Sequence, residues 1–86
     1  MPTSYILINS DLGTDESIIK KLKEMLADEK NTQYEIQGVY GVYDIVLKLT
    51  SDDIDSLRST ITNKIRKITS VQSTLTMMVI EEQGKS

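Results

Sequence analysis

The centre of the chain constrains the fold most. Two runs of residues that favour β-strands meet there at Gly41, and a single acid, Asp44, precedes a nearly continuous apolar run. Glycine reaches positive φ without steric cost, so it suits the tight turn of a β-hairpin. We therefore predict a hairpin whose strands cover 33–40 and 43–50 and whose turn is formed by Gly41 and Val42.

One strand pattern and one helix pattern stand on each side of this hairpin. Before it, we predict a strand at 4–10 and a helix at 14–29. After it, we predict a helix at about 52–68 and a strand at 71–81. Apolar residues recur at spacings of three and four in both helices, so each helix buries one stripe. The stripes are Ile18, Ile19, Leu22, Met25 and Leu26, and then Ile54, Leu57, Ile61, Ile65 and Ile68.

The element order is therefore β-α-β-β-α-β. This order predicts a ferredoxin-like α+β sandwich, in which a four-stranded antiparallel sheet carries both helices on one face. Eighty-six residues are enough for one domain, 1–86. We expect its core at about 4–82 and a flexible tail at 83–86.

The predicted strands are apolar on both faces. A sheet with helices on one side and water on the other alternates apolar and polar residues. Residues 5–8, 45–47 and 77–80 are instead continuous apolar runs. The helices cover one face, and the simplest cover for the other is the same sheet of a second copy. We therefore predict a homodimer that forms through the sheet.

The composition argues against several classes of function. The chain has no histidine, cysteine or tryptophan, so the commonest general base and two common zinc ligands are missing. Its formal net charge of −3 is unlike the basic face of proteins that bind nucleic acid directly. No apolar run approaches the roughly 20 residues of a membrane span, and no signal peptide is apparent. We expect a cytoplasmic protein that is not an enzyme and uses no cofactor.

Two charge clusters are interpreted as the ends of the second helix. Three acids within 52–55 stand at its start, where negative charge interacts favourably with the helix dipole. Three basic residues within 64–67 stand at its end, where positive charge does the same. These interpretations are favoured over a metal site and a phosphate-binding patch.

The hairpin turn is the candidate site. Asp44 is the only acid in its strand and lies beside Gly41 and Tyr43. A carboxylate held there can pair with an ammonium group, and nearby turn N–H groups can receive a carboxylate. That combination suits a zwitterion such as a free amino acid. Thr74 and Thr76 can add hydroxyl contacts, although β-propensity also explains them.

Two segments resemble the ligand-binding domain of the leucine-responsive/asparagine-operon (Lrp/AsnC) regulators, also called the RAM domain. The first motif is a Gly-x-aromatic-Asp turn that opens an aliphatic strand, here 41–48. The second is a Ser/Thr-x-x-Thr start to the last strand, here within 71–79. The resemblance covers roughly 4–82.

The resemblance implies a domain that dimerises through its sheets and assembles into rings of dimers, as an octamer or a decamer. It implies an amino-acid effector bound between dimers, with Gly41, Tyr43 and Asp44 in the pocket and Thr74 and Thr76 as weaker candidates. The chain begins at the first strand of the domain. It therefore resembles the stand-alone form without a DNA-binding helix-turn-helix, which would influence transcription through full-length regulators of the family.

Two residues depart from the family pattern. Tyr40 stands where Ser or Thr usually precedes the glycine, and Val42 stands where a polar residue usually follows it. Both join the candidate ligand-binding residues. They favour an apolar or aromatic amino acid, or a pocket that holds no ligand.

Three other functions stay open on the sequence. An ACT-type amino-acid-sensing domain shares the strand order but places its site at the first strand–helix turn, here 9–13. A small cofactor-free dimeric oxygenase or isomerase shares the fold, but such enzymes line a deep pocket with histidine or several aromatic residues. A structural subunit would mediate oligomerisation and bind nothing.

Overall fold

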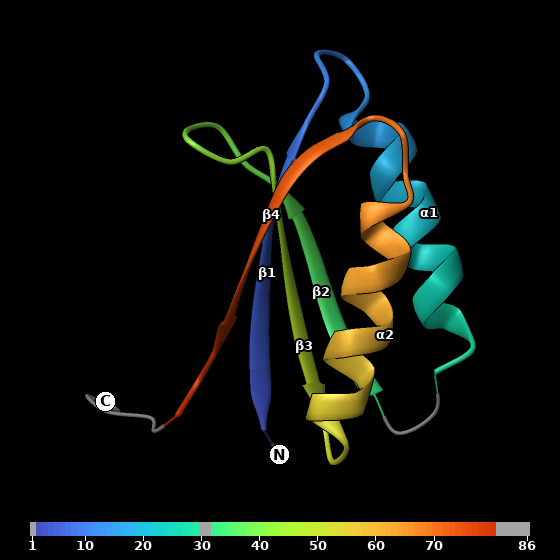
Figure 1. Ribbon diagram of the computed structural model, residues 1–86, viewed down its shortest axis with the longest axis vertical. Helices are drawn as coiled ribbons and strands as arrows, with labels where there is room; N and C mark the ends of the chain where they lie inside the picture. The colour runs from blue at the N-terminus through green and yellow to red at the C-terminus, as the bar shows by residue number, and fades with distance from the viewer. Residues whose placement is uncertain (1, 30–31, 81–86) are drawn as a thin grey trace.

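The fold is the predicted α+β sandwich. The computed structural model describes residues 2–29 and 32–80. Its strands form one antiparallel sheet in the order β2-β3-β1-β4, and both helices lie against one face of it (Figure 1). The elements are β1 (Thr3–Ser10), α1 (Asp15–Ala27), β2 (Thr32–Gly38), β3 (Ile45–Ser51), α2 (Ile54–Arg66) and β4 (Val71–Met78).

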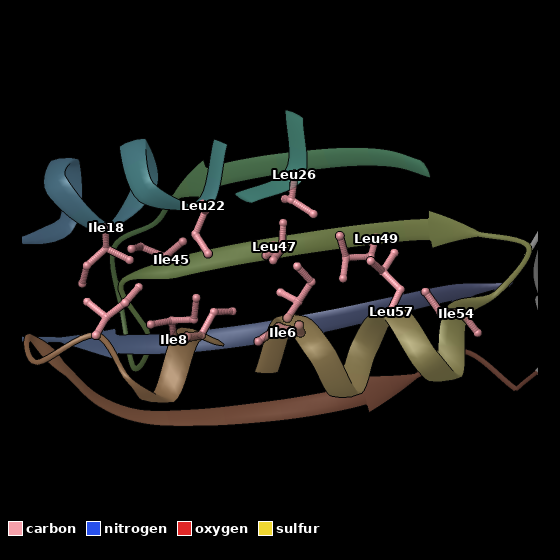
Figure 2. Close-up of a cluster of buried hydrophobic side chains, with 13 residues drawn as sticks. Ile6, Ile8, Ile18, Leu22, Leu26, Ile45, Leu47, Leu49, Ile54 and Leu57 are labelled. Atoms are coloured by element: carbon pink, nitrogen blue, oxygen red, sulfur yellow. The ribbon is translucent and has the colours of Figure 1, made fainter. Parts of the chain in front are cut away.

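The core fills the space between the helices and the two central strands. Alternate residues of β1 and β3, such as Ile6 and Leu47, are fully buried, and Figure 2 shows them pointing toward the apolar stripes of both helices. Each buried Ile or Leu side chain contributes roughly 1.5–3 kcal/mol to folding. Within the predicted stripes, only Ile19 and Met25 are partly exposed. No helix in the described part of the chain is long and apolar enough to cross a membrane.

Both helices are shorter than predicted. α1 ends at Ala27 rather than at 29, and α2 covers 54–66 rather than about 52–68. Asp53 is the N-cap residue of α2, and its N–H donates to the Ser51 Oγ at 3.3 Å. The last turn of α2 carries Lys64 and Arg66, as expected for basic residues at a helix end.

The last strand is also shorter than predicted. β4 ends at Met78, which lies opposite Ser4 near the first residue of β1. Only the N–H of Val79, which donates to the Thr3 carbonyl at 3.0 Å, extends the pairing. The strand therefore stops where its partner begins. Residue 81, the rest of the predicted core to 82 and the predicted tail at 83–86 lie outside the described residues.

The hairpin connection is longer than the two residues predicted. β2 ends at 38 and β3 begins at 45, so 39–40 and 43–44 leave the ladder. The N–H of Val39 donates to the Asp44 carbonyl at 2.8 Å and closes the loop, while the N–H of Asp44 turns to the Ile8 carbonyl at 3.0 Å. This bond to β1 is why the third strand starts late. Gly41 has a positive φ of 155°, as its place in the turn predicts.

The outer face of the sheet is apolar in one half only. Tyr5 lies opposite Met77, and Leu7 lies opposite Leu75 on one side and Val46 on the other. The apolar runs predicted at 5–8 and 45–47 do not extend across the whole outer face, because polar residues occupy the outward positions of β2 and of the rest of β3. These residues are Gln33, Glu35, Gln37, Lys48 and Thr50.

Candidate functional site

Two loops at one end of the sheet form a pocket of about 330 Å³. Figure 1 shows the β1–α1 loop and the β2–β3 loop side by side at the top of the molecule. We call this hollow the loop pocket. Its lining comes from the end of β1 and the loop that follows, from the start of α1 and from the hairpin connection. The lining residues are Ser10, Asp11, Leu12, Gly13, Asp15, Val39, Tyr40 and Asp44.

Asp44 joins the two loops. Its Oδ2 accepts the backbone N–H of Ser10 at 2.9 Å and lies 3.4 Å from the Ser10 hydroxyl. Ser10 stands at a shift in register between β1 and β4, where Gln72 is the extra residue of a β-bulge. The other carboxylate oxygen of Asp44 has no hydrogen-bond partner within 2–29 and 32–80. Asp44 therefore has one oxygen engaged in the fold and one available to a ligand.

Asp11 fixes the β1–α1 loop to the turn after α2 and to the start of β4. Its N–H donates to the Ser70 carbonyl at 2.8 Å, and its Oδ1 accepts the side-chain amide of Gln72 at 2.9 Å. Its own carbonyl accepts the N–H of Thr14 at 3.1 Å and the Thr14 hydroxyl at 2.7 Å. Thr14 is the N-cap residue of α1, but its hydroxyl donates to the Asp11 carbonyl instead of capping the helix.

The lining of the loop pocket is acidic. Asp11, Asp15 and Asp44 contribute three carboxyl groups, and the lining contains no lysine or arginine. These acids are too far apart to chelate, since the described residues contain no group of three or more possible metal ligands. The arrangement favours a cationic group that forms hydrogen bonds, such as an ammonium group.

The structure brings some of the predicted site residues together and separates others. Tyr40 and Asp44 line the loop pocket, and Gly41, Val42 and Tyr43 belong to the same loop. The candidates in the last strand lie elsewhere. Thr74 and Thr76 are on the edge strand β4 and line a different groove along α2, with β1 between them and the hairpin.

The candidate residues chosen from the sequence did not include Ser10, Asp11 or Asp15. A signal for them was present, because a polar stretch directly follows the apolar run of the first strand. The turn at 9–13, where an ACT-type domain would bind its ligand, overlaps this stretch. In the folded chain this turn and the Gly-x-aromatic-Asp turn line one pocket.

Comparisons with known proteins identify the family. Residues 3–85 match the sequence model of a family described as the Lrp/AsnC ligand binding domain. A search of curated proteins found no match.

Solved structures resemble this chain over nearly its whole length. FFRP-DM1 is 36% identical with a TM-score of 0.72, over 93% of this chain and 100% of that one. The hypothetical protein PHS023 from Pyrococcus horikoshii is 36% identical with a TM-score of 0.71, over 95% of this chain and 93% of that one. AsnC from E. coli is 27% identical with a TM-score of 0.69, over 99% of this chain but only 54% of AsnC.

The family match includes both motifs that carry the resemblance, within 41–48 and 71–79. It makes the domain a regulatory module of the effector-binding type. This chain belongs to the Lrp/AsnC ligand-binding domain family.

Proposed function

We propose that the domain binds a free amino acid, or a similar small effector, in the loop pocket and acts without catalysis. The observation that carries this proposal is the Asp44 carboxylate, held in place by Ser10 with its second oxygen available. In this proposal Asp44 binds the ammonium group of the effector. The N–H groups of the loop around Gly41 receive its carboxylate.

The size of the loop pocket supports a small effector. Its volume of about 330 Å³ lies at the lower end of the roughly 300–1,000 Å³ of typical ligand sites. A charge-assisted hydrogen bond from an ammonium group to a carboxylate contributes about 1.5–3 kcal/mol. Tyr40 at the rim can pack against an apolar side chain of the effector, and this supports the preference predicted from the sequence.

The three acids of the pocket favour a second class of effector. Asp11, Asp15 and Asp44 together exceed the charge of one ammonium group. A basic amino acid or a diamine carries a second positive charge that would neutralise more of this lining. Lysine and putrescine therefore belong in the same screen as the apolar amino acids.

The apolar half of the outer sheet face supports dimerisation. Leu75 and Met77 are 45% and 44% exposed in the single chain, although they lie in register with Leu7 and Tyr5. Face-to-face packing of two copies would bury these side chains at about 25 cal/mol per Å² of apolar area.

A second exposed group supports the assembly of dimers into a ring. The side chains of Leu12, Tyr40 and Val42 are almost fully exposed at the loop end. A neighbouring dimer placed there would cover them and help to enclose the loop pocket. We further propose that such an assembly acts in the cytoplasm, together with full-length regulators of its family.

A thermal-shift screen tests the effector proposal. The wild-type protein is screened against the twenty amino acids and putrescine. Asp44→Asn keeps an oxygen for the Ser10 N–H but loses the charge, so it should lose little of its Tm and lose the ligand-induced rise. The control is Asp52→Asn, which removes one exposed acid outside the pocket. A ligand response that survives in Asp44→Asn would refute the role assigned to this residue.

Light scattering after size-exclusion chromatography tests the dimer proposal. We expect Leu75→Glu to lower the mass toward that of one chain, because it places a charge in the apolar half of the outer face. Gln33→Glu adds the same charge to the polar half and should leave the mass unchanged. A wild-type protein that is already monomeric at micromolar concentration would contradict this proposal.

A further inference from the structure

A groove of about 400 Å³ lies between α2 and the edge strand β4. The two elements leave the turn at 67–70 in diverging directions (Figure 1), and the groove shares no lining residue with the loop pocket. We call it the α2–β4 groove. From the helix it is lined by Arg58, Thr62 and Arg66, whose spacing of four places them on one face. From the strand it is lined by Thr74 and Thr76.

The charge of the α2–β4 groove is opposite to that of the whole chain. Two arginines line it and no acidic residue does, although the chain has a formal net charge of −3. Within the described residues, neither Arg58 nor Arg66 hydrogen-bonds to a carboxylate. Hydroxyl groups stand on both walls, at Thr62 on the helix and at Thr74 and Thr76 on the strand. The groove therefore presents mostly hydrogen-bond donors.

Two polar atoms of these lining residues are buried without a partner. They are the Nε of Arg58 and the Oγ1 of Thr62, and Thr62 is only 9% exposed. Buried polar atoms are nearly always hydrogen-bonded in folded proteins, so each exception needs an explanation. Both atoms are closed to solvent, so a bound group with several acceptor oxygens would satisfy them only after the side chain of Arg58 moves.

The end of the helix does not explain this arrangement. Arg66 lies in the last turn of α2, where a positive charge interacts favourably with the helix dipole. Arg58 lies eight residues earlier, in the second turn of the helix, where the dipole of the helix end gives a positive charge no advantage. The position of Arg58 and the buried hydroxyl of Thr62 therefore have no role in ending the helix.

We propose that the α2–β4 groove binds a small metabolite that carries a phosphate group. The guanidinium fork of arginine matches the oxygens of a phosphate, which can accept hydrogen bonds from donors on several sides. Arg58 and Arg66 supply the charge from one wall, and the hydroxyls of Thr74 and Thr76 reach the phosphate from the other. The volume of about 400 Å³ leaves room for the rest of the metabolite beyond the phosphate.

A titration followed by NMR of the isotopically labelled protein tests this proposal. The probes are inorganic pyrophosphate and adenosine monophosphate, with citrate as a carboxylate probe and sodium chloride at matched ionic strength. Both phosphate compounds should shift the amide signals of 58–66 and 74–76 in a saturable way below about 10 mM. Shifts that only follow ionic strength, or citrate binding as tight as pyrophosphate binding, would overturn the proposal.

Matched variants locate the site. Arg58→Gln should weaken pyrophosphate binding at least about tenfold, because one charged fork is lost. Lys64→Gln removes the same charge from an exposed position of α2 outside the groove and should change the affinity by less than about twofold. If the two substitutions weakened pyrophosphate binding equally, the binding would depend only on the total charge of the helix, and the proposed site would be refuted.

Thr62→Val keeps the test decisive if Arg58→Gln folds poorly. The substitution preserves the shape of the side chain and removes the buried hydroxyl. We expect a higher Tm together with weaker pyrophosphate binding. A higher Tm with unchanged pyrophosphate binding would overturn the placement of the phosphate against this wall of the groove. Effector binding in the loop pocket is measured separately and should not change, since the two sites share no residue.

Discussion

The loop pocket and the α2–β4 groove use polar groups in opposite ways. In the loop pocket, Asp44 accepts hydrogen bonds from Ser10, and Asp11 accepts one from Gln72, so the acids also hold the loops together. In the groove, Arg58 and Thr62 have buried polar atoms with no hydrogen-bond partner in the described part of the chain. Substitutions in the pocket should therefore lower the free energy of unfolding, and substitutions in the groove should raise it or leave it unchanged.

Asp44→Ala should have the largest effect. It leaves the partly buried N–H of Ser10 without an acceptor, which costs about 1–3 kcal/mol of the free energy of unfolding. Urea denaturation measures the loss. Asp44→Asn, which retains an acceptor oxygen, should lose less than half as much. If both variants were equally unstable, the charge rather than the hydrogen bond would hold the loops.

Gly41→Ala tests the backbone of the loop pocket. The positive φ of 155° is strained for any residue with a Cβ, so we expect a loss of about 1–3 kcal/mol. Gly38→Ala is the matched control, because a Cβ there would meet the Cδ1 of Ile19 at 3.9 Å, an ordinary contact. This control should leave the stability unchanged or raise it by about 0.5 kcal/mol. Equal losses in the two variants would contradict the loop geometry.

Thr62→Val should act in the other direction. Removing a buried hydroxyl that has no partner should raise the free energy of unfolding by about 1 kcal/mol. Thr60→Val, at an exposed position of the same helix, should change it by less than about 0.5 kcal/mol. A destabilised Thr62→Val protein would remove the contrast between the two sites.

Gln72→Ala should have the smallest effect. Its side-chain amide reaches Asp11 at 2.9 Å, but the bond is exposed to solvent. We expect a loss below about 0.5 kcal/mol in urea denaturation. A loss as large as that of Asp44→Ala would show that the β-bulge, rather than the hairpin loop, holds the pocket.

The sequence predicted the fold well because each element carries its own periodic pattern. Helical spacing alone identifies the apolar stripe that includes Ile18 and Leu22. The order of the elements then restricts the topology. The length of the hairpin loop could not be read in the same way. Asp44 leaves the strand because it bonds Ile8 and Ser10, which are more than thirty residues away in the sequence.

The candidate site was predicted only in part for the same reason. The motif identified Asp44 and its loop, but Asp11 reaches the pocket through its bonds to the α2–β4 turn. Thr74 and Thr76 lie within the second motif, yet they line a groove along α2 instead of the loop pocket. A period of two places residues on the same face of a strand, but it does not determine which neighbouring element that face meets.

The β-bulge next to Ser10 has a consequence for experiment. The backbone N–H of Ser10 donates to the carboxylate of Asp44, which is itself a proposed ligand contact, rather than to a carbonyl of the neighbouring strand. An effector that binds the second oxygen of Asp44 would hold the carboxylate in this position, and the Ser10 amide proton should then exchange more slowly with solvent deuterium. A single amide of the unmodified protein can therefore report whether the pocket is occupied, with no label attached to the effector.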